Sequence, residues 1–350
     1  MSNASPTLPS TMRAIVVEEF GAVEKALKLK SVPTPAPRPG YAIIKVKAFG
    51  VNHAEMHMRR GEWAESMPII GIECVGIVVS ALPSPGEQAL EPGTPVVTLM
   101  GGLGRTIDGS YAEYTAARLS NVVPVPRALV AQLGWARLAA LPETYATAWT
   151  CLFRNLGLQP GERLLVRGAT SAFGMAAVKL AVNKGAVVSA TGRSPERTEE
   201  LKALGVHEVL REEGGALTER LILEGRKFDK VLELVGNSTV VGSLKLLRRG
   251  GILCLAGWLG GLDPIEFNPL LQMASGVYFS FFGSFVFGED EFPLTDVPFA
   301  EIVGMITSGA LESEPKRVFE FGEDGVREAH RLMEAGQAGG KMVVVVDSAL

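Results

Sequence analysis

Seven residues in the middle of the chain have the side chains that a phosphate-binding turn requires. After the apolar residues 164–166 and Arg167, the sequence continues with Gly168, Ala169, Thr170, Ser171, Ala172, Phe173 and Gly174. Small side chains let backbone N–H groups approach a pyrophosphate, and the amino end of a following helix adds partial positive charge. Ser171 and Ala172 stand where the dinucleotide fingerprint often has glycines, so an ordinary turn of small residues remains the alternative. We interpret residues 168–174, the phosphate loop, as the pyrophosphate site of a dinucleotide cofactor.

The next expected strand ends in residues that would select between NAD and NADP. Proteins selective for NAD usually have Asp or Glu about twenty residues after the phosphate loop, where it bonds the ribose 2′-hydroxyl. Here that stretch reads Thr191, Gly192, Arg193 and Ser194, with Arg197 one helical turn later. Arginine and hydroxyl groups are suitable donors to a 2′-phosphate. We therefore expect NADPH as the cofactor; the alternative is a solvated helix start whose arginines have no special role.

Two further turns are expected at the same edge of the sheet. Val235 and Gly236 follow one apolar run, and Ala256 and Gly257 follow the next. A glycine at the end of a strand allows a cofactor to come close to the backbone, although a plain turn can have the same composition. We expect both turns to contact the cofactor.

The elements that must position these residues alternate between strand and helix from about residue 138 onward. Short apolar runs are expected as strands at 163–166, 187–190, 208–210, 230–234 and 251–255. Residues of helical composition occupy 139–156, 173–183, 195–204, 217–223 and 240–247. Such alternation indicates parallel βαβ units with helices on both faces. The predicted fold class is α/β, with a Rossmann-type doubly wound parallel sheet over residues 139–276.

The remaining sequence predicts a second domain that is discontinuous. Residues 12–126 contain short β-rich runs separated by turns rich in Pro and Gly, which indicate a barrel. Lys341–Val346 reads as a buried strand that we expect to return to this domain. Residues 12–138 with 277–350 are thus expected to form a β-barrel catalytic domain, and residues 1–11 a flexible tail.

The composition argues against several other classes of protein. The chain of 350 residues is long enough for two domains, and its net charge of −4 gives no electrostatic reason to expect nucleic acid as the main partner. No apolar run approaches the roughly 18–20 residues that span a bilayer. The opening residues lack the basic start and apolar core of a secretion signal. Cys74, Cys151 and Cys254 have no paired spacing, so we expect reduced thiols and a cytoplasmic protein.

Several motifs, taken in order, resemble those of the medium-chain dehydrogenases/reductases over residues 12–346. They are Gly50–Glu55 with Gly61, Gly71–Gly76, Leu141–Trp149, the phosphate loop, Thr191–Ser194 and Gly339–Val344. The chain is similar in particular to the zinc-independent quinone oxidoreductase branch, the zeta-crystallin-like family. The resemblance implies a GroES-like barrel as the catalytic domain and the Rossmann domain as the NADPH-binding domain.

Zinc-dependent relatives in this superfamily have ligands that this chain lacks. They carry a Cys in the first motif and a Gly-His-Glu in the second, and here those places hold Asn52 and Ile72. An amide and an isoleucine cannot replace a thiolate and an imidazole, so we expect no metal site. Without a Lewis acid, suitable hydride acceptors are electron-poor quinones, or conjugated enones and enoyl thioesters whose charge spreads over an enolate.

The resemblance also suggests residues close to the reacting groups. Asn52 matches the asparagine that lines the nicotinamide pocket in this branch, and His57 could donate a proton to an enolate. Thr147 and Lys341 match positions near the cofactor. Phe282 lies in an aromatic stretch that resembles both the cleft wall and the subunit-contact strand of the family. The alternatives are a turn-forming Asn, a solvated His, an exposed Lys and plain interior packing of the aromatic residues.

The predicted function is NADPH-dependent transfer of hydride to a quinone or an activated C=C bond (an enone) without zinc, mainly by positioning the reactants. A 2-enoyl-thioester reductase and a non-catalytic NADPH-binding regulatory protein are the alternatives. The expected partners are a small-molecule acceptor and a second copy of the chain, as a homodimer.

Overall fold

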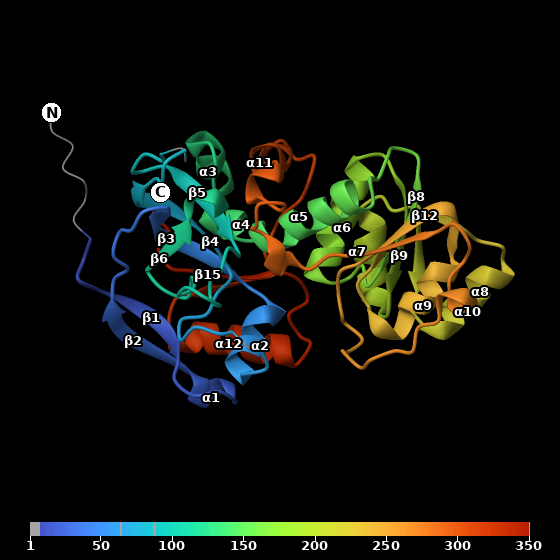
Figure 1. The fold of residues 1–350 in the computed structure, drawn as a ribbon, viewed down its shortest axis with the longest axis horizontal. Coiled ribbons are helices and arrows are strands. Elements are labelled where there is room, and N and C mark those ends of the chain that lie inside the picture. The colour runs from blue at the N-terminus through green and yellow to red at the C-terminus, as the bar shows by residue number, and fades with distance from the viewer. Residues whose placement is uncertain (1–7, 64, 87–88, 350) are drawn as a thin grey trace. The chain divides into compact units, whose positions relative to one another are not determined.

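The computed structural model describes residues 8–63, 65–86 and 89–349, and the chain forms two compact units (Figure 1). The first unit combines Met1–Glu143 with Ser284–Leu350, and the second unit is Thr144–Gly283. The sequence placed the two junctions a few residues earlier, after 138 and 276. Residues 1–7 of the predicted tail lie outside the described residues, whereas Thr11 pairs with Pro33 and so belongs to a strand rather than to the tail.

The second unit contains a parallel sheet of six strands, and the predicted doubly wound α/β class is confirmed. The strand order is β10-β9-β8-β11-β12-β13, and every neighbouring pair is parallel. The chain order reverses between β8 and β11, the point where such sheets leave room for a ligand beyond the carboxyl ends of the strands. The strands are β8 (Arg163–Arg167), β9 (Val187–Gly192), β10 (Glu208–Arg211), β11 (Phe228–Glu233), β12 (Leu247–Leu255) and β13 (Tyr278–Phe281).

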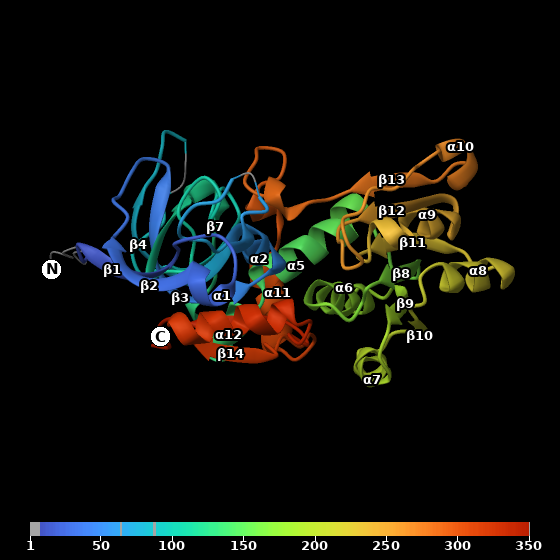
Figure 2. The same ribbon diagram turned by 90° about the horizontal axis from the view of Figure 1, so that it is seen from below.

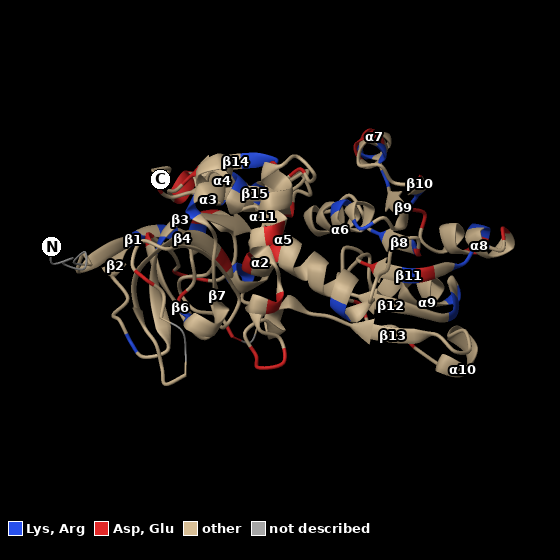
Figure 3. Cartoon of the chain, turned by 90° about the horizontal axis from the view of Figure 1, so that it is seen from above, with Lys and Arg blue, Asp and Glu red and all other residues tan. Residues whose placement is uncertain are grey.

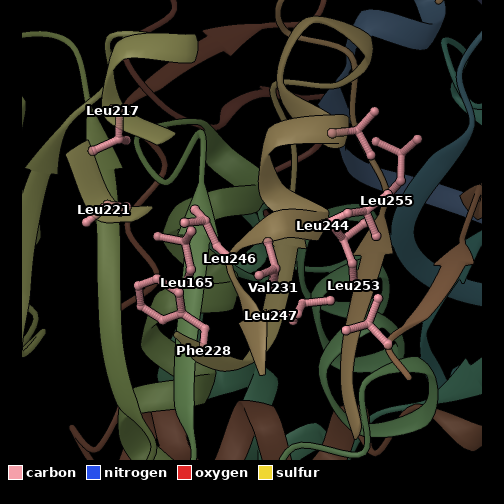
Figure 4. Packing of buried hydrophobic residues seen from close by; sticks show 12 residues of the cluster. Leu165, Leu217, Leu221, Phe228, Val231, Leu244, Leu246, Leu247, Leu253 and Leu255 are labelled. Carbon is pink, nitrogen blue, oxygen red and sulfur yellow. The ribbon is translucent and has the colours of Figure 1, made fainter. Parts of the chain in front are cut away.

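Helices cover both faces of this sheet, with α6 and α7 on one side and α8 and α9 on the other (Figure 2). The helices are α5 (Pro142–Trp149), which continues as a π-helix η2 (Thr150–Asn155), then α6 (Ala172–Asn183), α7 (Pro195–Ala203), α8 (Gly215–Leu223), α9 (Asn237–Lys245) and α10 (Pro269–Gln272). Leu217 and Leu244 of α8 and α9 pack on Val231 of β11 in one buried cluster (Figure 4). Burial of such apolar area holds the helices, and therefore the loops that precede them, against the sheet.

The strands of the first unit pair antiparallel, except for the parallel pair of β14 and β15. Its main sheet has the order β14-β15-β3-β4-β5-β7, with β6 also paired to β3, and β1 and β2 form a separate ribbon. The strands are β1 (Thr11–Val17), β2 (Leu27–Pro33), β3 (Tyr41–Val51), β4 (Glu73–Leu82), β5 (Pro95–Leu99), β6 (Tyr114–Arg118), β7 (Val122–Pro124), β14 (Arg317–Glu320) and β15 (Met342–Val345). Met342 of β15 lies opposite Val51 of β3, so the C-terminal strand returns to this unit, as the sequence predicted.

The helices of the first unit surround these strands. They are α1 (Val23–Ala26), α2 (His53–Arg60), η1 (Leu119–Asn121), α3 (Arg127–Leu133), α4 (Trp135–Leu138), η3 (Ser284–Val286), η4 (Leu294–Asp296), α11 (Phe299–Thr307) and α12 (Glu323–Glu334). Helix α2 begins directly after β3 and ends at Gly61, whose φ of 74° is a left-handed conformation that favours glycine. This short helix holds Glu55 of the first motif and His57, and Asn52 is its N-cap residue.

Charged residues of both signs are interspersed over each unit (Figure 3). This pattern agrees with the small net charge of −4. Among the described residues, no helix is long and apolar enough to span a membrane.

Candidate functional site

The phosphate loop lies between the end of β8 and the start of α6, and it is tightly closed on itself. Ser171 accepts a hydrogen bond from the backbone N–H of Gly174 at 3.0 Å and donates its hydroxyl to the carbonyl of Gly168, also at 3.0 Å. A Cβ added at Gly174 would lie 2.5 Å from that carbonyl oxygen and 2.7 Å from the Cα of Ala169. Only glycine fits there, because the obstacle is backbone that cannot turn away.

The amino end of α6 leaves hydrogen-bond donors available. The N–H of Gly174 is occupied by Ser171, but over the described part of the chain the N–H groups of Ala172 and Phe173 have no acceptor. Such groups at a helix amino end, together with the helix dipole, bind phosphate oxygens. The loop therefore fits a pyrophosphate in shape and in donor chemistry.

The end of β9 is tied to the phosphate loop. Thr191 accepts a hydrogen bond from the N–H of Gly168 at 3.0 Å, and the guanidinium of Arg197 donates to the carbonyl of Thr170 at 2.6 Å. Arg197 also pairs with Glu200 at 2.6 Å, and Ser194 caps the start of α7. The side chains predicted to select the cofactor thus gather beside the phosphate loop, with Arg193 exposed.

The turns after β11 and β12 pack against each other through glycine. Gly236 has a φ of 101°, and a Cβ there would lie 2.8 Å from the carbonyl oxygen of Gly257. The backbone N–H groups of Val235 and Gly236 both donate to a carboxylate oxygen of Glu233, at 2.9 and 3.2 Å. These two amides are therefore occupied within the protein, so any cofactor contact there would be made by other atoms of the turn.

The structure brings most of the predicted cofactor residues to one edge of one sheet. The carboxyl ends of β8, β9, β11, β12 and β13 lead into the predicted contacts, namely Gly168–Gly174, Thr191–Ser194, Val235–Gly236, Ala256–Gly257 and Phe282. Phe282 is buried and donates its backbone N–H to Leu255 at 2.9 Å, and Thr147 is buried on α5. Asn52, His57 and Lys341 belong to the first unit.

In the first unit, four polar side chains form a group that we call the Lys341 cluster. They are the buried Glu55, Glu73 and Lys341 and the half-buried Asn52. The ammonium of Lys341 donates to Asn52 Oδ1 at 2.6 Å and to Glu73 Oε1 at 2.5 Å. Asn52 Nδ2 donates to Glu73 at 2.8 Å and to Glu55 at 3.4 Å. The amide predicted to face the substrate is therefore already bonded on both its oxygen and its nitrogen.

Glu55 is the most perturbed acid of this cluster. Burial raises the pKa of Glu55 to about 7, opposed by the N–H of Ile72, which donates to its carboxylate at 3.0 Å, and assisted by the negative charge of Glu73. Glu73 is fully buried and also accepts the N–H of Glu143 at 2.7 Å. With one ammonium and two carboxylates, the cluster is neutral when one carboxylate holds a proton, and it can hold or release a proton near neutral pH.

His57 lies on α2, outside the cluster's hydrogen bonds. Its Nδ1 is 2.5 Å from a carboxylate oxygen of Glu62, and its ring stacks on Trp63 with centroids 6.4 Å apart. The side chain is about a third exposed, at 31%. An imidazole bonded to a carboxylate and open to solvent can exchange protons, as a proton donor must.

The positions that hold zinc ligands in related enzymes are occupied differently here. Among residues 8–63, 65–86 and 89–349, no group of three or more His, Cys, Asp or Glu side chains could hold a metal ion. The ammonium of Lys341 bridges Asn52 and Glu73 instead. A fixed cation thus lies where a metal would need to be bound by these groups.

Sequence reasoning missed the partners that hold the site together. Glu55 and Glu73 entered the sequence analysis only as members of two family motifs. Arg167 and Glu233 bond to groups at the sheet edge. From the sequence, Arg167 was named only as the residue before the phosphate loop, and Glu233 lay unremarked in the strand expected at 230–234. A charged residue inside an otherwise apolar strand was the available signal, because such a residue is rarely buried unless it is paired.

The comparisons with known proteins agree with this architecture. Residues 38–127 match the alcohol dehydrogenase GroES-like domain, and residues 172–300 match the zinc-binding dehydrogenase domain. With the six-stranded parallel sheet and its phosphate loop, these matches define an oxidoreductase of the medium-chain dehydrogenase/reductase class.

The relatives narrow this class further. A quinone oxidoreductase of Rattus norvegicus is 30% identical over 344 residues, covering 96% of this chain and 98% of the rat protein. The chain belongs to the quinone oxidoreductase family. A mycobacterial protein solved in complex with NADPH has a TM-score of 0.81 at 26% identity, covering 96% of this chain and 100% of its own. A mycobacterial quinone oxidoreductase has a TM-score of 0.80 at 26% identity with the same coverage.

Proposed function

We propose that this protein uses NADPH to reduce a quinone or an activated C=C bond, without zinc. The observation that carries the proposal is the phosphate loop with the acid-free end of β9 beside it, where Thr191, Ser194 and Arg197 replace the acidic residue of NAD-selective proteins. The rat relative's name, quinone oxidoreductase, and the NADPH bound in a mycobacterial neighbour support it. NADPH, when bound, would supply the hydride.

The cofactor choice rests on the two arginines at the start of α7. Arg193 is exposed and Arg197 is anchored to the carbonyl of Thr170, so both could donate to a 2′-phosphate. Arg193→Ala with Arg197→Ala should raise the dissociation constant of NADPH far more than that of NADH, measured by nicotinamide fluorescence. Lys202→Ala, on the last turn of the same helix and paired with Glu199, is the matched control. Equal losses for the two cofactors would contradict the proposal.

The Lys341 cluster is the proposed site of polar assistance to the acceptor. Of the three N–H groups of the ammonium, two bond to Asn52 and Glu73, so one is left to bond a developing negative charge on an acceptor oxygen. Asn52 would act by fixing the ammonium, and His57 would return a proton to an enolate. His57→Phe should slow the reduction of enones more than that of quinones, and equal slowing would remove His57 from the mechanism.

Zinc independence is proposed from the same cluster. The ammonium of Lys341 occupies the oxygens of Asn52 and Glu73 that a metal ion would bind. A metal ion would therefore have to displace this ammonium. Metal analysis of the purified protein should find no stoichiometric zinc, and treatment with a chelator should leave the rate of NADPH oxidation unchanged. Loss of activity on chelation, restored by zinc, would refute this part of the proposal.

The acceptor class is open to a direct test. A panel of a quinone, an enone and a 2-enoyl-CoA, each with NADPH, should show the fastest loss of nicotinamide absorbance with the quinone or the enone. A clear preference for the enoyl-CoA would instead favour the thioester reductase. Tight binding of NADPH without oxidation by any acceptor would favour a non-catalytic role.

We also propose a homodimer formed through β13, in a cytoplasmic protein. β13 is the last strand of its sheet, and the side chains of Tyr278, Phe279 and Phe281 are exposed on it. Unpaired edge strands with apolar side chains readily pair with another chain. Phe279→Lys should shift the mass measured by light scattering from dimer to monomer, whereas Leu223→Lys, at a more exposed apolar position on α8, should not.

A further inference from the structure

A buried arginine beneath the phosphate loop is the feature that the proposed function does not yet explain. Arg167 is the last residue of β8, directly before Gly168, and it is fully buried. An arginine is rarely buried in this way, because removing its charge from water is costly unless partners compensate. The groups that bond to the Arg167 guanidinium therefore indicate what this residue does.

The guanidinium of Arg167 bonds to groups from several elements at the carboxyl edge of the sheet. Nε donates to Glu212 at 3.0 Å, and Nη2 donates to the other oxygen of the same carboxylate and to the carbonyl of Gly214 at 3.2 Å. Nη1 donates to Thr218 at 3.3 Å and to Ser243 at 3.2 Å. These partners lie after β10, on α8 and on α9, so one side chain connects three segments that are distant in sequence.

The same network reaches the turn after β11 through Glu233. This carboxylate is fully buried, 4.0 Å from Nε of Arg167, and accepts the hydroxyl of Ser243 at 2.5 Å. Its other oxygen accepts the N–H groups of Val235 and Gly236. Burial raises the pKa of Glu233 and the positive charge of Arg167 opposes this. The arginine thus favours the charged form of this carboxylate at the base of that turn.

The network also reaches the phosphate loop through Thr191. Burial opposes ionisation of Glu212, but the hydrogen bond and charge of Arg167 and, to a smaller extent, a hydrogen bond from Thr191 lower its pKa. The hydroxyl oxygen of Thr191 also accepts the N–H of Gly168 at 3.0 Å. In addition, the N–H of Glu212 donates to the carbonyl of Gly192 at 2.9 Å. The first residue of the phosphate loop is therefore fixed by a chain of bonds that ends at Arg167.

We propose that Arg167 is a positioning residue for the dinucleotide, acting through Glu212 and Glu233 to set the phosphate loop and the turn after β11. The proposal rests on the proposed function, in that it assumes a dinucleotide at this edge of the sheet. Arg167 itself is buried and saturated with protein partners, so it does not contact the ligand. Because the network bonds to the loop and the turn, which would hold the pyrophosphate common to both cofactors, it serves NADPH and NADH alike.

The test compares Arg167→Met with Arg163→Met, a change at the exposed first residue of the same strand. Dissociation constants of NADPH and NADH are measured by fluorescence well below the unfolding temperature, with circular dichroism to confirm that each variant is folded. Arg167→Met should raise both constants by the same factor, roughly tenfold or more, since small misplacements of binding groups are costly. Arg163→Met should leave both unchanged.

A double variant separates positioning from a loss of stability. Arg167→Met with Glu233→Gln removes the two fully buried charges of the network and leaves only Glu212, so it should recover part of the lost affinity relative to Arg167→Met alone. Amide hydrogen exchange over 168–174 should be faster in Arg167→Met and not in Arg163→Met. A lower unfolding temperature with unchanged dissociation constants would overturn the proposal. If wild-type protein bound neither cofactor, the proposed function would fail instead, whatever the variants did.

Discussion

His330 should make the first unit sensitive to acid. The side chain lies on α12, is fully buried, and has its Nε2 3.1 Å from the hydroxyl of Tyr111. Burial, with the nearby charges of Arg59 and Arg60, lowers the pKa of His330 to about 3. The imidazole is therefore neutral in the folded protein at every pH at which the fold is expected to persist.

The size of the effect follows from the difference between folded and unfolded states. An unfolded histidine has a pKa of about 6.5, so between pH 6.5 and 3 the unfolded chain binds a proton that the folded chain does not. Keeping His330 neutral therefore costs the folded protein nothing above pH 6.5, and the free energy of unfolding falls as the pH drops below 6.5. At about 1.36 kcal/mol per pH unit, the loss is about 2 kcal/mol at pH 5 and about 5 kcal/mol near pH 3.

Urea unfolding at pH 7 and pH 5 tests this for three proteins. Tyr111→Phe keeps the histidine, whereas Tyr111→Phe with His330→Leu removes the titrating group together with its partner. Wild type and Tyr111→Phe should each lose about 2 kcal/mol more stability than the double variant between these pH values. If all three proteins responded to pH equally, His330 would have to be charged or exposed in the folded state, and the reasoning would be refuted.

Three other perturbations probe the two candidate sites. Burial raises the pKa of Glu55 to about 7, above its usual 4.5, so the contribution of Glu55 to the free energy of unfolding should fall as the pH rises from 4.5 to 7. Glu55→Gln should remove up to about 3 kcal/mol of this pH dependence, measured by urea unfolding. An unchanged dependence of stability on pH in this variant would contradict the expectation. Gly174→Ala should raise the dissociation constants of NADPH and NADH by a similar factor, because its Cβ would meet backbone at 2.5 Å, whereas Gly304→Ala, with open space around it, should not. Lys341→Met should destabilise the protein by about 3–5 kcal/mol by leaving buried Glu73 without its cation, and Glu73→Gln in the same chain should restore part of the loss in thermal unfolding.

The parallel sheet could be predicted from the sequence because its strands are apolar along most of their length. Strands buried on both faces leave a continuous apolar run, and the helices between them were equally clear. The helix expected at 139–156 begins at Pro142, and its regular α-helical bonding breaks at Thr150, from where a π-helix continues to Asn155. Local composition does not reveal such breaks, since they depend on packing around the helix.

The ribbon strand β2 escaped prediction for a related reason. In Leu27–Pro33 most side chains are exposed and two are lysines, so the segment lacks the apolar signal of a buried strand. It is a strand because its backbone pairs with β1 from Val17 to Thr11. Pairing with a distant segment is a tertiary property, and intrinsic preference for strand is weak when packing decides.

In the candidate site, too, features formed by consecutive residues could be predicted, and features formed by residues far apart in the sequence could not. The phosphate loop is a property of consecutive residues, so small side chains between a strand and a helix were enough to find it. The Lys341 cluster and the Arg167 network join residues far apart in the sequence, such as Lys341 with Asn52 and Arg167 with Ser243. Nothing in the local composition indicates which acid a buried cation will meet.

Asn52 illustrates what a motif can and cannot specify. The motif predicted an amide in the position of a missing metal ligand, and it could not predict that both ends of the amide would be bonded within the protein. A saturated amide binds a substrate only by giving up one of its bonds, which is costly when the partners are buried. In the mechanism that we propose, the N–H of the Lys341 ammonium that bonds to neither Asn52 nor Glu73 would stabilise an oxyanion without breaking a bond. On that proposal, the position of Asn52 matters chiefly because it holds that ammonium in place.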